Sequence, residues 1–121
     1  MVFHRFLAGE VPRRKLKILV NGIEIKPWDP YSRSEPKVKV LTPIILNLEH
    51  EGVSDEITLA PFVLPNQKNY SSQEAFRKAS GPAKWNRQQG FYIYRANRMI
   101  QSGGWCRLRT SDEHTKLARV A

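Results

Sequence analysis

The residues with the clearest chemical potential lie in the second half of the chain, where positive charge is unopposed. Between Phe76 and Ser111 there is no acidic residue, whereas the basic residues are Arg77, Lys78, Lys84, Arg87, Arg95, Arg98, Arg107 and Arg109. Such side chains neutralise phosphate groups, and aromatic rings placed among them can stack on bases. The candidate contacts to a partner or a nucleic acid are Arg87, Arg95, Asn97, Arg98 and Arg107.

The aromatic residues of this stretch have a simpler explanation than base stacking. Phe91-Tyr92-Ile93-Tyr94 has the pattern of a core strand, and aromatic rings are more often buried in a core than left exposed. The arginines are different. If Ala96-Asn97 forms a hairpin loop, Arg95 and Arg98 face each other directly, and opposed like charges destabilise a strand pair. We therefore expect an anion to bind there: a carboxylate, a phosphate or a nucleic acid.

The sequence offers no catalytic centre. It lacks a Walker-type glycine loop, a dinucleotide-binding fingerprint and a Gly-x-Ser-x-Gly elbow. The three histidines, His4, His50 and His114, lie far apart and have no partner at the spacing of helical metal sites. The only cysteine, Cys106, is expected to be a small buried residue of a strand. We predict no catalytic residue, no metal site and no cofactor site in this chain.

Composition limits the class of protein. The chain of 121 residues has room for one domain. Its 20 Lys and Arg against 11 Asp and Glu give a net charge of +9. This excess favours polyanionic partners, but it fits equally a piece of a protein whose acidic counterpart lies elsewhere. No apolar run is long enough to span a bilayer. A lone cysteine excludes an internal disulfide and fits a reducing compartment, so we predict a cytoplasmic location.

The elements of the first half are mostly strands. Alternating residues at 15–20, the Asn21-Gly22 turn and residues 23–25 predict a β-hairpin. A second turn is expected at Glu51-Gly52. Further strand-like segments lie at 37–41, 44–48 and 55–64. Pro61, inside the last of these, indicates an edge strand or a bulge.

The second half contains a short helix and a second hairpin. Ser71-Ser72-Gln73-Glu74 fits a capping box in which Ser71 accepts from the Glu74 amide, and Gly81-Pro82 ends the helix. Residues 90–95 and 98–100 predict a hairpin, and apolar residues on both of its faces indicate a central strand covered on both sides. A short strand is expected at 105–108 and another element at 116–120. This order of strands with few helices predicts an α+β fold.

The second hairpin also carries a family likeness. Gly90-Phe91-Tyr92-Ile93-Tyr94-Arg95-Ala96-Asn97-Arg98-Met99-Ile100 resembles a hairpin in the second domain of MORC-like ATPases of the GHKL superfamily, which includes gyrase B, heat-shock chaperones, histidine kinases and MutL. Ala96 departs from the asparagine or glycine usual at that turn. Weaker likenesses lie at 3–7, 16–30, 63–65, 104–105 and 116–120.

The resemblance implies a transducer domain of ribosomal-protein type, with a mixed sheet, few helices packed on one face and an incomplete edge. Residues 1–14 would be the tail of a preceding nucleotide-binding domain and a connector, and residues 15–121 a transducer domain truncated at its C-terminus. The domain would relay nucleotide state to domain or dimer closure. ATP and Mg would be bound by the preceding domain of the parent protein, so the parent would be the ATPase and this chain would have no activity alone. The implied partners are that ATPase domain, a second copy of the parent protein, and DNA or RNA, but no membrane.

A function of another class remains open. The chain would then be a free-standing basic module that binds nucleic acid and needs no ATPase domain. Because such binding releases counterions from the phosphates, its affinity would fall steeply with salt.

Overall fold

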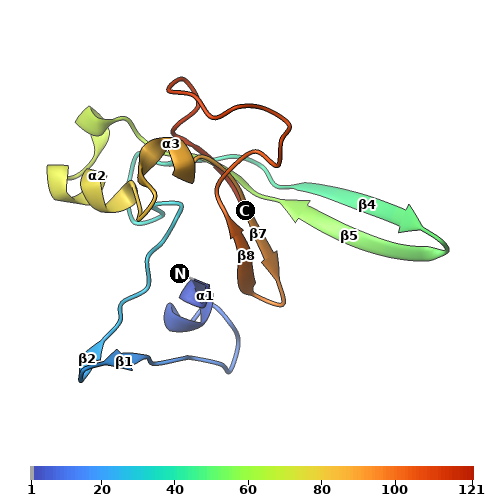
Figure 1. The fold of residues 1–121 in the computed structure, drawn as a ribbon, viewed down its shortest axis with the longest axis horizontal. Coiled ribbons are helices and arrows are strands. Elements are labelled where there is room, and N and C mark those ends of the chain that lie inside the picture. Colours follow the sequence, from blue (N-terminus) through green and yellow to red (C-terminus); the bar gives the residue numbers. More distant parts are fainter. Residues whose placement is uncertain (1) are drawn as a thin grey trace.

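The computed structural model describes residues 2–121 as an α+β fold built on a mixed five-stranded sheet (Figure 1). The order across the sheet is β3 (Lys39–Val40), β6 (Pro61–Val63), β9 (Ala118–Val120), β7 (Gly90–Arg95) and β8 (Arg98–Ser102). Strand β9 runs antiparallel to β6 and parallel to β7. The last residues of the sequence therefore form the central strand of the sheet.

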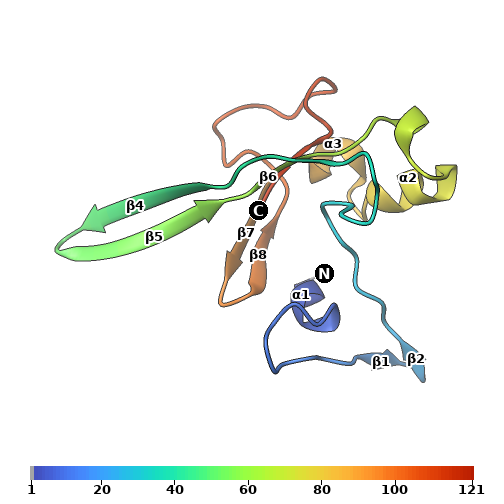
Figure 2. The same ribbon diagram turned by 180° about the vertical axis from the view of Figure 1, so that it is seen from behind.

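Two further hairpins stand apart from this sheet. The first joins β1 (Leu19–Val20) to β2 (Ile23–Glu24), and the second joins β4 (Ile44–His50) to β5 (Val53–Leu59). The second is a long arm that projects from the body (Figures 1 and 2). Both turn residues of each hairpin have positive φ, as mirror-image two-residue turns require. The turns predicted at Asn21-Gly22 and Glu51-Gly52 are confirmed.

The helices are short. They are α1 (His4–Leu7), α2 (Gln73–Ala79) and α3 (Lys84–Gln88), with a 3-10 turn at Gln67–Asn69. In both views α2 and α3 lie at one end of the body, and α1 lies beside the β7–β8 hairpin (Figures 1 and 2). Over the described range, 2–121, no helix has the length and apolar character needed to cross a membrane.

The core contains a buried arginine among aromatic rings. Arg119 of β9 is fully buried; its Nη1 donates to the Pro30 carbonyl (2.5 Å) and its Nη2 to the Ala79 carbonyl (2.8 Å). Its guanidinium lies 5.1–6.0 Å from the ring centres of Trp28, Trp85 and Tyr92. The buried apolar cluster of the core consists of Tyr31, Phe62, Leu64, Tyr92 and Met99. Arg119 therefore links the central strand to the end of α2 and to the loop before β3.

The helix cap predicted at Ser71 is wrong by one residue. Ser72 is the cap of α2, and its Oγ accepts from the Ala75 amide (3.0 Å). Ser71 instead donates its Oγ–H to the carboxylate of buried Glu35 (2.7 Å). The Ser71 hydroxyl, which the local sequence pattern assigned to the helix cap, is therefore bonded to Glu35, a residue distant in sequence.

Other predictions are also corrected by the structure. Residues 105–108 form a turn and not a strand, because Cys106 (φ 52°) and Arg107 (φ 64°) have left-handed backbone. Cys106 is exposed, not buried. Pro61 begins an inner strand, a position that proline tolerates because it is the first residue. Strand β7 is not covered on both sides, since Ile93 is 37% exposed. Helix α3 was not predicted.

Candidate functional site

The hairpin of residues 90–100 forms as predicted, with arginines at its tip. Ala96 (φ 49°) and Asn97 (φ 63°) form the two-residue turn, and Arg95 pairs directly with Arg98. Both arginines are exposed. Neither forms an ion pair with any carboxylate of residues 2–121. Two like charges therefore lie side by side on a solvent-exposed tip.

The five candidate contact residues do not form one patch. Arg95, Asn97 and Arg98 lie at the tip of the hairpin. Arg87 lies in α3 just before β7, and Arg107 lies in the turn after β8. These two exposed side chains are at the base of the hairpin, roughly 16 Å from the tip at about 3.3 Å per residue. The tip and the base must be considered as separate sites.

The N-terminal segment docks on this tip. The Met99 amide donates to the Val2 carbonyl (3.1 Å), and Arg5 Nη1 donates to Asn97 Oδ1 (3.3 Å). The Arg98 guanidinium lies 5.5 Å from the centre of the Phe3 ring. These contacts hold the single turn of α1, which is too short to be stable by itself.

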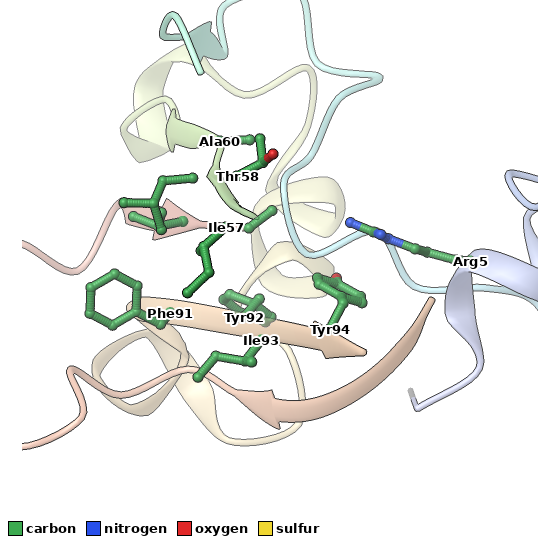
Figure 3. A pocket seen from close by; sticks show the side chains of 11 residues that line it. Arg5, Ile57, Thr58, Ala60, Phe91, Tyr92, Ile93 and Tyr94 are labelled. Atoms are coloured by element: carbon green, nitrogen blue, oxygen red, sulfur yellow. The ribbon is translucent and has the colours of Figure 1, made fainter. Parts of the chain in front are cut away.

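A chain of three hydrogen-bonded side chains, with a half-buried tyrosine between two buried residues, continues from α1 into the core. His4 Nε2 and Tyr94 Oη are 2.6 Å apart, as are the hydroxyl oxygens of Tyr94 and Tyr31. His4 is 1% and Tyr31 2% exposed. The Arg5 guanidinium covers the Tyr94 ring at 3.6 Å from its centre (Figure 3). Tyr94 therefore joins α1, strand β7 and the segment before β3.

The electrostatics of this chain favour its neutral form. Burial lowers the pKa of His4, although the nearby Glu10 carboxylate opposes this. Burial raises the pKa of both Tyr31 and Tyr94. With all three groups neutral, the hydrogen bonds can run from Tyr31 through Tyr94 to His4 Nε2, or from His4 Nε2 through Tyr94 to Tyr31, depending on which ring nitrogen of His4 carries the proton. Protonation of His4 would make Nε2 a donor to Tyr94 and would leave only the second of these directions.

The aromatic residues of the basic stretch pack on one another. The Phe91 ring meets the Trp105 ring edge-on at 5.5 Å, and the Trp85 ring stacks on Phe76 at 4.7 Å. Tyr92 is 1% exposed, and its hydroxyl donates to the Gln88 side chain (2.7 Å). Tyr92 is therefore part of the core, and the half-buried rings of Phe76, Trp85, Phe91 and Trp105 pack against one another in pairs.

Within residues 2–121, no group of three or more His, Cys, Asp and Glu side chains is placed to hold a metal ion. No protein family, curated protein or solved structure matches this chain. Its function must be inferred from its own residues.

The contacts between the N-terminal segment and the β7–β8 hairpin were not predicted from the sequence. His4 and Tyr94 are separated by 90 residues, and neither belongs to a motif that names the other. The sole hint is that a histidine and aromatic residues lie in a short segment at the very start of the chain.

Proposed function

We propose that this chain is the transducer module of a GHKL-type ATP-binding protein, which relays nucleotide state to domain or dimer closure and is not catalytic by itself. The support comes from the docking of the N-terminal segment: the His4–Tyr94–Tyr31 chain ties α1 to β7 and to the core. A buried polar network loses much of its stability when one member moves away. In this proposal, a movement of the domain that precedes α1 would break the His4–Tyr94 hydrogen bond and so change the stability of strand β7 and the sheet.

The tip of the β7–β8 hairpin forms a second connection between α1 and the sheet. Arg5 is bonded to Asn97, and Arg98 lies over the Phe3 ring, so the arginine-bearing tip and α1 would move together. In this proposal residues 1–14 are the tail of a nucleotide-binding domain and a connector. Residues 15–121 are a ribosomal-protein-type transducer with an incomplete sheet. The preceding domain binds ATP and Mg, the parent protein closes as a homodimer, and its location is cytoplasmic.

The test is photoaffinity labelling with 8-azido-ATP and Mg²⁺ of two samples: the native protein isolated from its source cell, and the recombinant 121-residue chain. We expect the native protein to be labelled and the recombinant chain to remain unlabelled, with excess ATP abolishing the labelling. An unlabelled native protein would refute the ATPase assignment. A labelled recombinant chain would refute the claim that nucleotide binds outside these residues.

A basic nucleic-acid-binding module is the second candidate, and the distribution of charge favours it. Residues 44–59 of the β4–β5 arm contain four acidic residues and no Lys or Arg. The rest of the chain therefore holds all 20 basic residues but only seven acidic ones. Arg95 and Arg98 are exposed at the hairpin tip without a carboxylate partner in the described residues.

Fluorescence anisotropy with a labelled single-stranded 20-mer DNA, between 50 and 200 mM salt, tests this candidate. We expect Arg95→Ala combined with Arg98→Ala to reduce the slope of log affinity against log salt by about 1.4, since each phosphate contact contributes roughly 0.7 for single strands. The matched control removes the same charge from the exposed pair Arg13 and Arg14. Equal slopes for both double variants would show that the hairpin tip is not the binding surface.

A further inference from the structure

A cleft of about 300 Å³ lies between the loop before β3 and helix α2, which are side by side in both views (Figures 1 and 2). Residues of the segment 27–35 line one side, and residues of the segment 70–79 line the other. The Trp28 indole donates to the Lys78 carbonyl (3.0 Å) and so joins the two sides. Because this volume is at the lower end of the range for ligand pockets, the cleft suits a small molecule or a single side chain.

The buried part of the cleft is polar. Ser32, Glu35 and Tyr70 line it, and each is only 8% exposed. The hydroxyl groups of Ser32 and Tyr70 are hydrogen-bonded to each other (3.1 Å). Ser32 has left-handed backbone (φ 48°), which a residue other than glycine keeps only where its surroundings fix it. The cleft therefore holds two hydroxyl groups and a carboxylate in fixed positions away from bulk water.

The two carboxylates that line the cleft differ in their partners. Asp29 forms an ion pair with Arg33 (3.2 Å). Glu35 accepts hydrogen bonds from the Ser71 amide (2.9 Å) and hydroxyl (2.7 Å), but within residues 2–121 it forms no ion pair. The buried Arg119 directs both of its Nη groups to backbone carbonyls. Because a buried charge without an opposite charge is unfavourable, Glu35 would be stabilised by a cation entering the cleft.

The hydrogen-bonding capacity of Glu35 indicates which cation fits. Each of its carboxylate oxygens accepts one hydrogen bond from Ser71 and can accept a second. A guanidinium presents two parallel N–H donors that match the two oxygens of a carboxylate. It is also less strongly hydrated than an ammonium group, and its planar face packs on aromatic rings, which Trp28 and Tyr70 supply here.

We propose that this cleft binds the guanidinium group of a ligand, with Glu35 as its counter-ion and the hydroxyls of Ser32 and Tyr70 as further hydrogen-bond acceptors. Two sources share this chemistry: an arginine side chain of a partner protein and a free small molecule. Lys78 opposes binding, since it lines the cleft and forms no ion pair in the described part of the chain. Recognition therefore depends on the charge of Glu35. This inference does not depend on the transducer proposal.

The first test is an NMR titration of the 121-residue chain, followed at the Trp28 indole N–H. The ligands are N-acetyl-arginine amide and N-acetyl-citrulline amide, which has nearly the same shape but no charge. We expect the arginine compound to bind about tenfold more tightly or better, the lower end for hydrogen bonds to a charged group. Equal affinity for both, or no binding of the arginine compound at millimolar concentration, would overturn the proposal.

A third titration, with ethylguanidinium, distinguishes the two sources. This compound carries the same cation without peptide groups. If it binds as tightly as the blocked arginine, a free small molecule is indicated. If it binds more weakly, the cleft recognises an arginine side chain within a protein.

Three variants locate the site. Glu35→Gln keeps the shape of the side chain and should remove most of the preference for arginine over citrulline. Glu74→Gln is the matched control, because it removes the same charge from an exposed position of α2 that does not line the cleft, and it should keep the preference. Lys78→Gln, at an exposed position, should strengthen binding of the arginine compound about twofold, the range for charges near the surface. Equal preferences in the two glutamine variants of glutamate would overturn the proposal. So would weaker binding in Lys78→Gln, which decides the question by itself if Glu35→Gln does not fold.

Discussion

Replacing Tyr94 by phenylalanine removes one oxygen atom from the middle of the His4–Tyr94–Tyr31 chain. The ring remains to pack under Arg5. Both hydrogen bonds are lost, and each partner is at most 2% exposed, so both partners lose a hydrogen bond at a position that is largely shielded from water. A buried polar group left without a partner costs about 1–3 kcal/mol. Two such groups give an expected loss of about 3 kcal/mol, a large share of the 5–15 kcal/mol typical of a domain.

The assay is urea unfolding followed by tryptophan fluorescence, with Tyr31→Phe as the matched control. Tyr31 is at the end of the chain, so its substitution removes one hydrogen bond and leaves Tyr94 bonded to His4. We expect that control to lose only about 1 kcal/mol. Hydrogen exchange of the Met99 amide, which donates to the Val2 carbonyl, should accelerate in Tyr94→Phe alone.

If Tyr94→Phe costs no more than Tyr31→Phe, the three side chains do not act as a unit. The same conclusion follows if the Met99 amide exchanges at its original rate. Either result would remove the physical basis for coupling α1 to the sheet, and with it the support for the transducer proposal.

Three further predictions concern stability. Gly90→Ala should lower the free energy of unfolding by more than about 3 kcal/mol or prevent folding, because Gly90 has φ 102° and a Cβ there would lie 2.2 Å from the Gly104 carbonyl oxygen. Gly52→Ala, which has open space around it, should lower it by only about 1 kcal/mol. Thermal unfolding of the two variants checks this difference. Since burial lowers the pKa of His4, the unfolded state binds more protons below about pH 6.5, and stability should fall as pH decreases from there, by at most about 1.4 kcal/mol per pH unit; a urea midpoint that His4→Gln leaves equally pH-dependent would contradict this. Arg119→Ala should cost about 3–5 kcal/mol, since it opens a cavity among aromatic rings and leaves two carbonyls without donors; a calorimetric unfolding temperature within a degree of the parent chain would show that Arg119 is not a structural link.

Elements with local causes could be predicted. The turns at Asn21-Gly22, Glu51-Gly52 and Ala96-Asn97 depend on a few neighbouring residues that accept positive φ. The direct pairing of Arg95 with Arg98 followed from the length of its turn. Such features need no information about distant segments.

Elements with distant causes were predicted wrongly. Residues 105–108 look strand-like, but Gln89, which is fully buried, accepts from the Trp105 indole (3.0 Å) and from the Thr115 hydroxyl (2.6 Å). These bonds hold the segment as a loop around an amide that the sequence marks only as polar. Ser71 was misassigned for a similar reason, because Glu35 lies 36 residues away.

The sequence by itself determined the α+β class, the hairpins and the charged tip, because alternation and turn chemistry act within a few residues. Only the tertiary structure decided that His4, Tyr31 and Tyr94 meet, and that Arg119 is buried with two backbone carbonyls as its partners. The physical reason is that strand order and side-chain burial depend on contacts between segments as many as 90 residues apart, and a polar residue looks the same in sequence whether its partner is water or the core.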